Sequence, residues 1–533
     1  MKPLCYWVLC FVFSFVLFSC NNSNTQKKEL AKNPKYGAVF AFSSPVTPSS
    51  LLPNELTSLY EQQISSLMYE PLFKVHSSGE IEGLIASGFR FSKDHNILSL
   101  NIKKNVLFHN HRVFGDVDRV LSAEDVAFSI AFACSSHPKN KNASLFENKI
   151  LGATEFFEQK NKTLGPDKFN GVRVVNDSTI DIVLMNQNKQ IINVLCHPSV
   201  PMLSYNAYKI LGDQMFKENI GTGPFCNPVF SENRIFFNRN PDYHQKDAQN
   251  NKLPFLDGVE VFLNISPVEG FEKGQLNIIQ NVDPKDIESL FGSLEGARNG
   301  NTFLHRAHVL KDKEFTFLLF NESTKPFNDL KIRQAFSNKI REELQLEKIY
   351  QGSANPDSMF FASVSSSFPS FSWRDTLEFA HGAYKSSQDS ALVFSIIKQF
   401  NSKGFSIKSK KADLNQVLTD GFGSAHLLKL SWVPDYDDKD SFLGLFFSKS
   451  NFSKQFGFKD AIYDSLYLRS VNSSKTLKNQ YIAEQRLYSQ CHLVPLFSKD
   501  LIYIANINMR GLKITQTGLF DLTNVYWKPV NKL

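Results

Sequence analysis

The distribution of apolar and polar positions predicts a chain that mixes short strands with longer amphipathic helices. Short apolar runs rich in Phe and Leu are typical of buried strands. The predicted strands are residues 235–238, 315–320 and 427–433. Longer segments in which apolar positions recur among polar ones are typical of helices. The predicted helices are residues 123–133, 329–350 and 389–403.

Residues at the ends of these segments support the helix assignments. Ser122 stands before the first helix and Asp125 follows three residues later, as in a variant of the capping box. Asp329 follows a proline-containing turn and begins the second helix, while Gly352 and Gly404 follow the second and third. Strands that alternate with helices indicate an α/β fold, and such varied connections favour more than one sheet.

The amino terminus carries an apolar run of a different kind. Residues 4–18 are too few to span a membrane comfortably and are typical of a signal-peptide core. The run ends in Leu17-Phe-Ser-Cys20, which resembles a lipobox although Phe18 replaces the usual small residue. We expect a lipoprotein signal peptide at residues 1–19, a diacylated Cys20 and a lipidated, flexible tether over residues 20–35. An ordinary signal peptide cut nearby, or an uncleaved anchor, is the alternative.

Composition narrows the class of protein further. A chain of 533 residues exceeds one ordinary hydrophobic core, so we expect two or three domains. Hydrophobic residues make up 42% and charged residues 21%, which is typical of a globular protein. The net charge of +7 is small for this length, and no run of Lys and Arg indicates nucleic-acid binding. The 49 phenylalanines fit a Phe-rich core better than an aromatic-lined cavity.

The cysteines leave disulfide pairing open. Beyond the signal peptide and Cys20, the cysteines are Cys134, Cys196, Cys226 and Cys491. Four cysteines allow three pairings, and an oxidising compartment permits these bonds without requiring them. No Cys-x-x-Cys pair and no Cys/His spacing indicates zinc. The motifs of metalloproteases, serine hydrolases and P-loop enzymes are also missing, so we expect a non-enzymatic protein without a cofactor.

Two clusters of turn residues carry the most information. Gly221-Thr-Gly-Pro-Phe225 and Asn238-Arg-Asn-Pro-Asp-Tyr243 flank the predicted strand at 235–238. By themselves they predict a β-hairpin, because glycine adopts positive φ freely and proline cannot donate a ladder hydrogen bond. The sequence of these two clusters resembles the signature of the extracellular solute-binding proteins of peptide and nickel ABC importers, the family that includes the oligopeptide- and dipeptide-binding proteins.

The resemblance continues in the family's order over roughly residues 36–530. The further matching segments are Tyr69-Glu-Pro-Leu-Phe73, Leu100-Asn-Ile-Lys-Lys-Asn-Val-Leu-Phe-His109, Leu121-Ser-Ala-Glu-Asp-Val-Ala-Phe-Ser129, Lys325-Pro-Phe-Asn-Asp-Leu-Lys-Ile-Arg-Gln-Ala-Phe336 and Trp432-Val-Pro-Asp-Tyr436. One departure is the stretch 110–120, where the family usually has a short turn.

The resemblance implies a fold and a domain order. The expected fold is the large two-lobed α/β periplasmic-binding-protein fold, type II, in its three-domain form. The implied domain I is discontinuous and comprises residues 36–56, 199–313 and 494–533. Domain II would be residues 57–198 and domain III residues 314–493. The ligand would lie between two lobes that close around it.

The resemblance also implies a function. The expected protein is the substrate-binding lipoprotein of an ABC importer, which captures oligopeptides in the periplasm or cell envelope and delivers them to the transmembrane subunits of a permease. We expect a monomer that is held on the membrane by its lipid and has no nucleic-acid partner. The alternative within the same fold is a binding protein for a murein peptide, haem, a nickel chelate or an oligosaccharide. A secreted hydrolase or an adhesin is the alternative outside it.

The resemblance assigns ligand-binding roles to the segment at 429–436. Asp435 matches the aspartate that meets the α-ammonium group of a bound peptide, which is sensible chemistry because a buried ammonium needs a carboxylate. Trp432 would wall the pocket beside the ligand, and Tyr436 belongs to the same segment. Lys429 stands where relatives use an arginine for the peptide carboxylate, although it could equally lie on a solvent face.

Two other clusters of polar residues have simpler interpretations. His109 and His111 have a spacing that a metal could use, but the resemblance puts His109 in a solvent-side turn. Asp437, Asp438 and Asp440 resemble the start of a calcium loop, but a lysine replaces the third oxygen ligand and no glycine follows. We expect these three carboxylates to form a solvated acidic turn and predict no metal site.

Overall fold

The computed structural model describes the chain from residue 33 to residue 528. The positions excepted within this range are 57, 77, 116, 160–163, 186–188, 281, 283, 299, 301, 303, 351, 357–374, 383–386, 402–404, 413–416, 418–419, 437 and 472–475. The predicted signal peptide, Cys20 and most of the predicted tether lie outside the described residues. In the part of the chain that is described, no helix is both long enough and apolar enough to cross a membrane.

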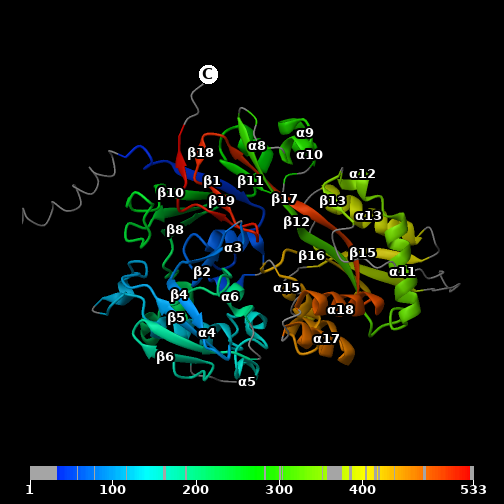
Figure 1. Cartoon of the computed structure of the whole chain (residues 1–533). Helices are drawn as coiled ribbons and strands as arrows, with labels where there is room; N and C mark the ends of the chain where they lie inside the picture. Colours follow the sequence, from blue (N-terminus) through cyan, green and yellow to red (C-terminus); the bar gives the residue numbers. More distant parts are fainter. Residues whose placement is uncertain are drawn as a thin grey trace, which may run out of the picture.

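The chain forms two lobes, and the first contains both ends of the described chain (Figure 1). One of its sheets has the strand order β1-β10-β9-β8, with β1 parallel to β10 and the other pairs antiparallel. These strands are β1 (Val39–Ser44), β10 (Gly258–Leu263), β9 (Arg234–Arg239) and β8 (Phe225–Ser231). The hairpin predicted around residues 235–238 is therefore confirmed as β8–β9.

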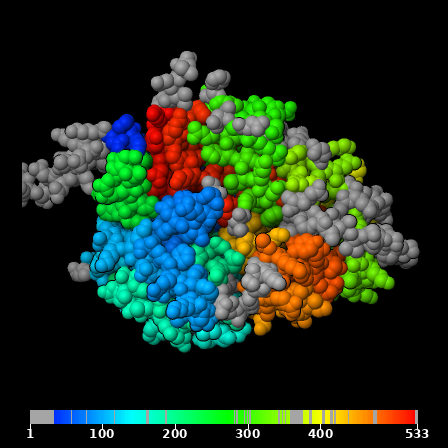
Figure 2. Space-filling model, viewed as in Figure 1, coloured from blue at the N-terminus to red at the C-terminus, as the bar shows by residue number. Residues whose placement is uncertain are grey.

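The carboxy-terminal residues complete the same lobe. Short pairs join β18 (Met509–Arg510) to β21 (Tyr526–Trp527) and β19 (Lys513–Ile514) to β20 (Phe520–Asp521). The Phe520 ring packs against Phe40 and Phe42 of β1, at centroid distances of 6.1 and 5.1 Å. In the space-filling view the red carboxy-terminal residues accordingly lie beside the blue amino-terminal ones (Figure 2).

A second antiparallel sheet lies at the far end of the first lobe. Its order is β4-β5-β7-β6, from β4 (Ala86–Phe91), β5 (Ile97–Ile102), β7 (Thr179–Val183) and β6 (Val172–Asn176). Helix α4 (Ala123–Ala133) packs against it and has the predicted bounds and capping box, in which Ser122 and Asp125 each bond the other's backbone. The remaining pair of short strands is β2 (Phe73–Val75) with β3 (Ile81–Gly83).

Short helices fill the rest of the first lobe. They are α3 (Leu59–Ser65), α5 (Ala153–Glu158), α6 (Ile191–Val194), α7 (Tyr205–Leu211), α8 (Pro267–Glu272), α9 (Pro284–Phe291) and α10 (Leu294–Arg298).

The central sheet runs from the first lobe into the second. Its order is β11-β17-β12-β16-β14-β15, and β13 (Ala354–Asn355) pairs with β17. The other strands are β11 (Ile278–Gln280), β17 (Leu493–Asn506), β12 (His305–Phe320), β16 (Leu427–Trp432), β14 (Thr376–His381) and β15 (Ser406–Lys411). The long strands β12 and β17 pair antiparallel along both lobes, with a register shift between Leu310 and Glu314. The predicted strands at 315–320 and 427–433 are confirmed as parts of β12 and β16.

The second lobe has a core on each face of this sheet, as the two-residue alternation of a strand requires. Phe317 and Leu319 belong to one apolar cluster, and Leu318 and Phe320 to the other. The first face is covered by α15 (Asp440–Leu443), α16 (Asn451–Phe456), α17 (Ala461–Val471) and α18 (Thr476–Ser489). The other is covered by α11 (Leu330–Glu343), α12 (Leu346–Tyr350) and α13 (Ser387–Asn401).

The single helix predicted at 329–350 is wrong in one respect, because α11 and α12 are separate. Leu344 has extended backbone angles, φ −74° and ψ 111°, which end α11. The sequence holds no glycine or proline there, so no local signal marks the break. Asp329 does cap α11 as expected, since its side chain accepts from the Lys331 amide.

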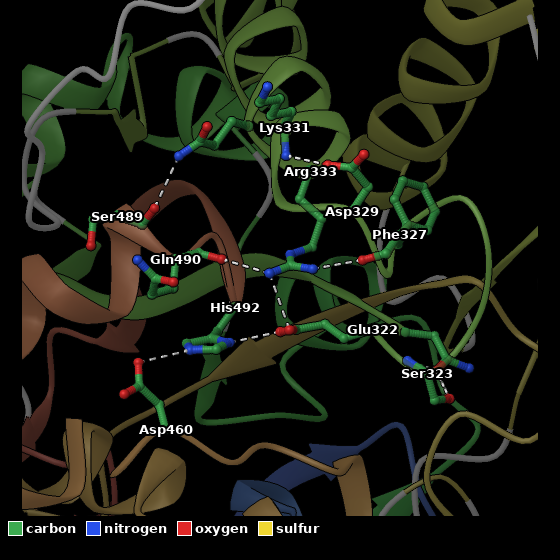
Figure 3. Close-up of polar contacts among 12 residues, drawn as sticks. Glu322, Ser323, Phe327, Asp329, Lys331, Arg333, Asp460, Ser489, Gln490 and His492 are labelled. Atoms are coloured by element: carbon green, nitrogen blue, oxygen red, sulfur yellow. Dashed lines mark hydrogen bonds and ion pairs between the residues drawn. The ribbon is translucent and has the colours of Figure 1, made fainter. Parts of the chain in front are cut away.

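Arg333 of α11 explains why the matching segment at 325–336 carries an arginine. It is buried, donates to the carbonyls of Phe327 (2.7 Å) and Gln490 (3.1 Å), and lies 3.2 Å from Glu322. Figure 3 shows these contacts and the imidazole of His492 on the other side of Glu322, at 2.7 Å. The network ties the start of α11 to the loop before β17, so we interpret it as structural.

The cysteines of the described residues form no disulfide, since Cys134, Cys196, Cys226 and Cys491 are all free thiols. Burial raises the pKa of the Cys226 and Cys491 thiols to about 11 and that of Cys196 to about 12. Neutral, buried thiols of this kind behave as small apolar side chains.

Candidate functional site

Three of the matching segments meet at one buried carboxylate, Glu70. Its oxygens accept hydrogen bonds from the Thr222 hydroxyl (2.9 Å) and the Tyr243 hydroxyl (2.7 Å), and the His244 Nε2 atom lies 3.1 Å away. These partners come from the loop before β8 and the turn after β9. Motifs far apart in the sequence therefore occur together because they satisfy one another's buried polar groups.

The glycines of this junction have a different role from the predicted one. Gly221 and Gly223 were expected to supply positive φ, but neither has it. Instead, a Cβ atom at either position would overlap the Met68 backbone. The sequence needs glycine here because two backbones approach closely, which is a requirement of the packing.

His109 also belongs to this junction, and the expectation of a solvent-side position is wrong. It is buried, its Nε2 atom is 3.0 Å from the Gly223 carbonyl, and its Nδ1 atom accepts from the Gly221 amide. Desolvation lowers the pKa of His109 to about 4. The described residues contain no group of three or more His, Cys, Asp and Glu side chains arranged for a metal.

The segment that follows β16 leaves the second lobe and packs into the first. Tyr436 is buried within the apolar cluster of the first lobe, and Val433 packs against that cluster. The Tyr436 hydroxyl donates to Asp440 Oδ2 at 2.5 Å, and Tyr467 donates to Asp440 Oδ1 at 2.8 Å. Burial, followed by the nearby Asp440 charge, raises the pKa of Tyr436 well above its ordinary value.

The prediction of a solvated acidic turn is therefore wrong for Asp440 and Asp438, and Asp437 lies outside the described residues. Asp440 is buried beneath its two tyrosine donors. Asp438 accepts from the side chains of Gln190 and Gln480, each at 2.8 Å. The sequence could not show this, because the donors come from elements distant in the chain.

These carboxylates face the first lobe across the boundary between the lobes. Lys149 Nζ lies 3.6 Å from Asp440 Oδ2, with side-chain exposures of 8% and 1%. Gln190, which donates to Asp438, also belongs to the first lobe. Figure 1 shows α15 lying at this boundary, next to α6. The lobes are thus joined by buried polar contacts in addition to the shared strands.

A cavity of about 380 Å³ opens where these parts meet. The first lobe contributes lining residues from 66–84, 193–198, 224–225, 243–245 and 513–523, and the second contributes Asp435 and Tyr436. Much of the wall is apolar, from Leu67, Leu84, Phe225, Ile514, Leu519, Phe520 and Leu522. The wall also carries charged side chains, among them Glu70, Lys74, Asp435, Lys513 and Asp521. Lys74 lies 3.4 Å from Glu82 and 3.8 Å from Asp521. A cavity that combines apolar walls with polar groups is the usual form of a ligand site.

Asp435 presents a carboxylate to this cavity. Its side chain is 23% exposed, and its backbone amide is fixed by the Ser441 hydroxyl at 2.9 Å. The nearest basic group is His197 Nε2, 3.5 Å from Oδ1. His197 Nδ1 accepts from the Ser199 amide, so the proton of a neutral ring is on the nitrogen that faces Asp435. The carboxylate therefore has acceptor capacity left for a ligand donor.

Lys429 and Trp432 do not line this cavity, and they lie on opposite faces of β16 because their positions along the strand differ by three, an odd number. Lys429 Nζ forms an ion pair with Asp389 Oδ1 at 3.0 Å. The Trp432 indole nitrogen is buried and has no hydrogen-bond acceptor among the described residues. The structure thus brings Asp435 and Tyr436 together and places the other two predicted residues along the strand that leads to them.

Sequence reasoning missed four residues of this region, namely Glu70, Lys149, Gln190 and His197. Glu70 lies in the family-like segment Tyr69–Phe73, and its position between a tyrosine and a proline is the only local pattern that marks it. The other three have no local pattern, since their roles depend on contacts across the boundary between the lobes.

Comparisons with known proteins agree with this architecture. The profile of the family described as bacterial extracellular solute-binding proteins, family 5 Middle, matches residues 80–454. The dipeptide-binding protein of Escherichia coli is 25% identical over 320 residues, which cover 57% of this chain and 55% of that protein. The oligopeptide-binding protein OppA of Bacillus subtilis is 20% identical over 570 residues, covering 98% of each chain.

Solved structures are similar over nearly the whole chain. Haemophilus influenzae OppA in complex with RPPGFSPFR has a TM-score of 0.76 at 17% identity, covering 93% of this chain and 100% of that one. The E. coli murein tripeptide binding protein MppA has a TM-score of 0.75 at 16% identity, covering 93% and 99%. The predicted two-lobed α/β fold is confirmed. Because the family profile covers most of the chain, this protein belongs to the bacterial extracellular solute-binding proteins, family 5.

Proposed function

We propose that this protein is the substrate-binding component of an ABC importer, that it captures oligopeptides between its two lobes, and that it delivers them to the transmembrane subunits of a permease. Family membership supports a transport role without catalysis. Its relatives support a peptide ligand, since they include dipeptide-, oligopeptide- and glutathione-binding proteins.

The observation that carries the peptide proposal is the position of Asp435. Its side chain is 23% exposed at a cavity to which both lobes contribute residues, and its backbone is held by Ser441. An ammonium group that leaves water keeps its charge only where a carboxylate and other acceptors replace the lost hydration. Asp435 supplies that carboxylate at a place where lobe closure excludes water, so we assign it to the α-ammonium group of a peptide.

The neighbouring residues support an extended ligand beside β16. The buried Trp432 indole N–H lacks an acceptor among the described residues, and a peptide carbonyl would satisfy it. Tyr436 is locked by Asp440 and gives the cavity a rigid apolar wall. Lys429 lies farther along β16 on its opposite face, in an ion pair with Asp389, so we assign it no direct contact with the same segment of ligand. An extended peptide held by backbone hydrogen bonds would tolerate varied side chains.

We further propose a location and a domain division for this function. Cys20 would be diacylated after removal of residues 1–19, so that the tether holds a monomer at the membrane in the periplasm or cell envelope. The domains would be I (36–56, 199–313 and 494–533), II (57–198) and III (314–493). Asn33 and Lys35 already contact the loop at 247–251, so the flexible part of the tether would end before them.

The test is calorimetry with matched peptides, after mass spectrometry of any ligand that co-purifies. Alanine peptides with free amino termini should bind, and the same peptides with acetylated amino termini should bind much more weakly, because only a free ammonium pairs with Asp435. Binding that does not distinguish the two sets would refute the role of Asp435. A co-purified haem, nickel chelate or oligosaccharide would replace the peptide proposal with the corresponding ligand.

A further inference from the structure

A row of polar residues lies on one face of the central sheet, between the core of the second lobe and the strands that enter the first. Lys429 lies opposite Leu318, and Ser431 lies opposite Thr316. Glu314, two residues before Thr316, lies opposite Lys499. Directly paired and alternate residues share a face of a sheet, so all these polar side chains are on one side.

Lys429, which the family resemblance links to a peptide carboxylate, already has an anionic partner within the protein. Lys429 Nζ lies 3.0 Å from Asp389 Oδ1, and the two side chains are only 11% and 15% exposed. Asp389 stands in the first turn of α13, where the helix dipole favours a negative charge. The pair is therefore short, largely shielded from water and supported by the fold around it.

Asp389 acts on a second lysine as well. Lys499 Nζ lies 3.2 Å from Glu314 Oε2. Burial lowers the pKa of Lys499, but the charges of Glu314 and Asp389 outweigh this effect and raise the pKa above its ordinary value. The row thus contains two ion pairs, Lys429 with Asp389 and Lys499 with Glu314, and their formal charges cancel.

A neutral row of this kind gives a ligand carboxylate little to gain. To reach Lys429 directly, the carboxylate would have to displace Asp389 and leave that charge without its partner in a partly buried place. To approach without displacing it, the carboxylate would meet two like charges as well as two opposite ones. A cation without a carboxylate partner would instead attract the carboxyl terminus of every peptide whose length brought it there.

We propose that Asp389 is a specificity determinant, which occupies Lys429 and so makes the second lobe indifferent to the carboxyl terminus of its ligand. This inference rests on the proposed peptide function. The favoured ligands are then peptides recognised by their amino end at Asp435, with a carboxyl end that is free, blocked or continued into a longer chain. Lys429 then does not select peptides by their length.

The test uses alanine peptides of two to six residues with free amino termini, each as the free acid and as the amide. Calorimetry on the parent protein should give acid and amide affinities within about threefold of each other at every length. Asp389→Asn keeps the shape of the side chain and removes its charge, so Lys429 becomes available. This variant should favour the acid by roughly tenfold or more at one length, as a charge-assisted hydrogen bond does. Glu269→Gln removes the partner of an exposed lysine elsewhere and should keep the parent ratio.

A second variant protects the test if Asp389→Asn folds poorly. Lys429→Gln leaves the Asp389 charge without its cation, so the acid should bind more weakly than the amide at the length that brings its carboxyl end to this row, and at other lengths the parent ratio should be kept. A parent that prefers the acid by more than about tenfold at one length, or a folded Asp389→Asn that shows no preference, would overturn the inference. Both results are compatible with a strong effect of amino acetylation, so the proposed function survives them. A protein that binds none of the peptides overturns the proposed function and the inference together.

Discussion

Replacing Lys149 by methionine should weaken ligand binding although Lys149 does not line the cavity. The side chain contacts Asp440 across the boundary between the lobes, and both groups are almost fully buried. In an open conformation the two groups would separate and be solvated by water. The substitution therefore removes a contact that belongs to the closed state alone, and closure is the state that holds ligand.

The size of the effect follows from what remains around Asp440. Removing one partner of a buried ion pair typically costs about 3–5 kcal/mol. Here the Lys149–Asp440 distance of 3.6 Å is long for a hydrogen bond, and Tyr436 and Tyr467 still donate to the carboxylate. We therefore expect a smaller cost of about 2 kcal/mol in the closed state, which lowers ligand affinity by roughly 30-fold.

Calorimetry gives the affinity, and small-angle scattering gives the compaction that ligand should cause. The Lys149→Met variant should need more ligand to reach the same compact radius of gyration. Its free energy of unfolding without ligand should fall by less than its free energy of ligand binding. Lys273→Met is the matched control. Its ion pair with Glu269 lies within one helix and its cap, and each of the two side chains is 62% exposed. An affinity of Lys149→Met within about twofold of the parent would show that this contact is not part of the ligand-bound state.

Three further predictions concern the ligand, the location and the response to pH. Asp435→Ala should lower the affinity for peptides with a free amino terminus by roughly 30-fold to several thousand-fold, since losing one partner of a desolvated pair costs about 2–5 kcal/mol; calorimetry should find acetylated peptides unaffected, and equal losses for both would contradict the assignment. Cys20→Ala should move the protein out of the membrane fraction or leave it unprocessed, and a wild-type protein without acyl chains in mass spectrometry would refute lipidation. Burial raises the pKa of Glu147 to about 7, so the folded state keeps a proton that the unfolded chain releases above about pH 4.5. The stabilisation from that proton is complete below pH 4.5 and is lost as the pH rises through 7, so Glu147→Gln should gain stability over the parent by about 2–3 kcal/mol between pH 4.5 and 8 in urea unfolding. A stability difference that does not change with pH would contradict this reasoning.

The features predicted well from the sequence are those encoded within a few residues. Ser122 and Asp125 mark the start of α4 because a capping box is a local arrangement. The strands around 315–320 and 427–433 are equally local, because a short apolar run between polar segments has few alternatives to a buried strand. The family-like segments extended this success to the two-lobed fold as a whole.

The features predicted poorly depend on which distant residues meet. Asp440 has the sequence context of a solvated turn, and only the tertiary structure brings Lys149 and Tyr467 to it. Asp389 precedes Lys429 by forty residues, so the ion pair that occupies this lysine cannot be predicted from a strand pattern. Gly221 shows the same limit, because its need for glycine comes from the Met68 backbone and from no torsion angle of its own.

The register shift between Leu310 and Glu314 has a mechanical consequence. Strands β12 and β17 pass between the lobes as one antiparallel ribbon, and the shift interrupts their pairing only locally. Asp312, at positive φ, is held in this interruption by Ser498 and Asp500. A ribbon of two strands flexes easily out of its plane and resists bending within it, so it permits one soft direction of motion. The lobes would then rotate about this ribbon as a hinge while its backbone hydrogen bonds stay intact. The side-chain contacts at the lobe boundary would set the lifetime of the closed state.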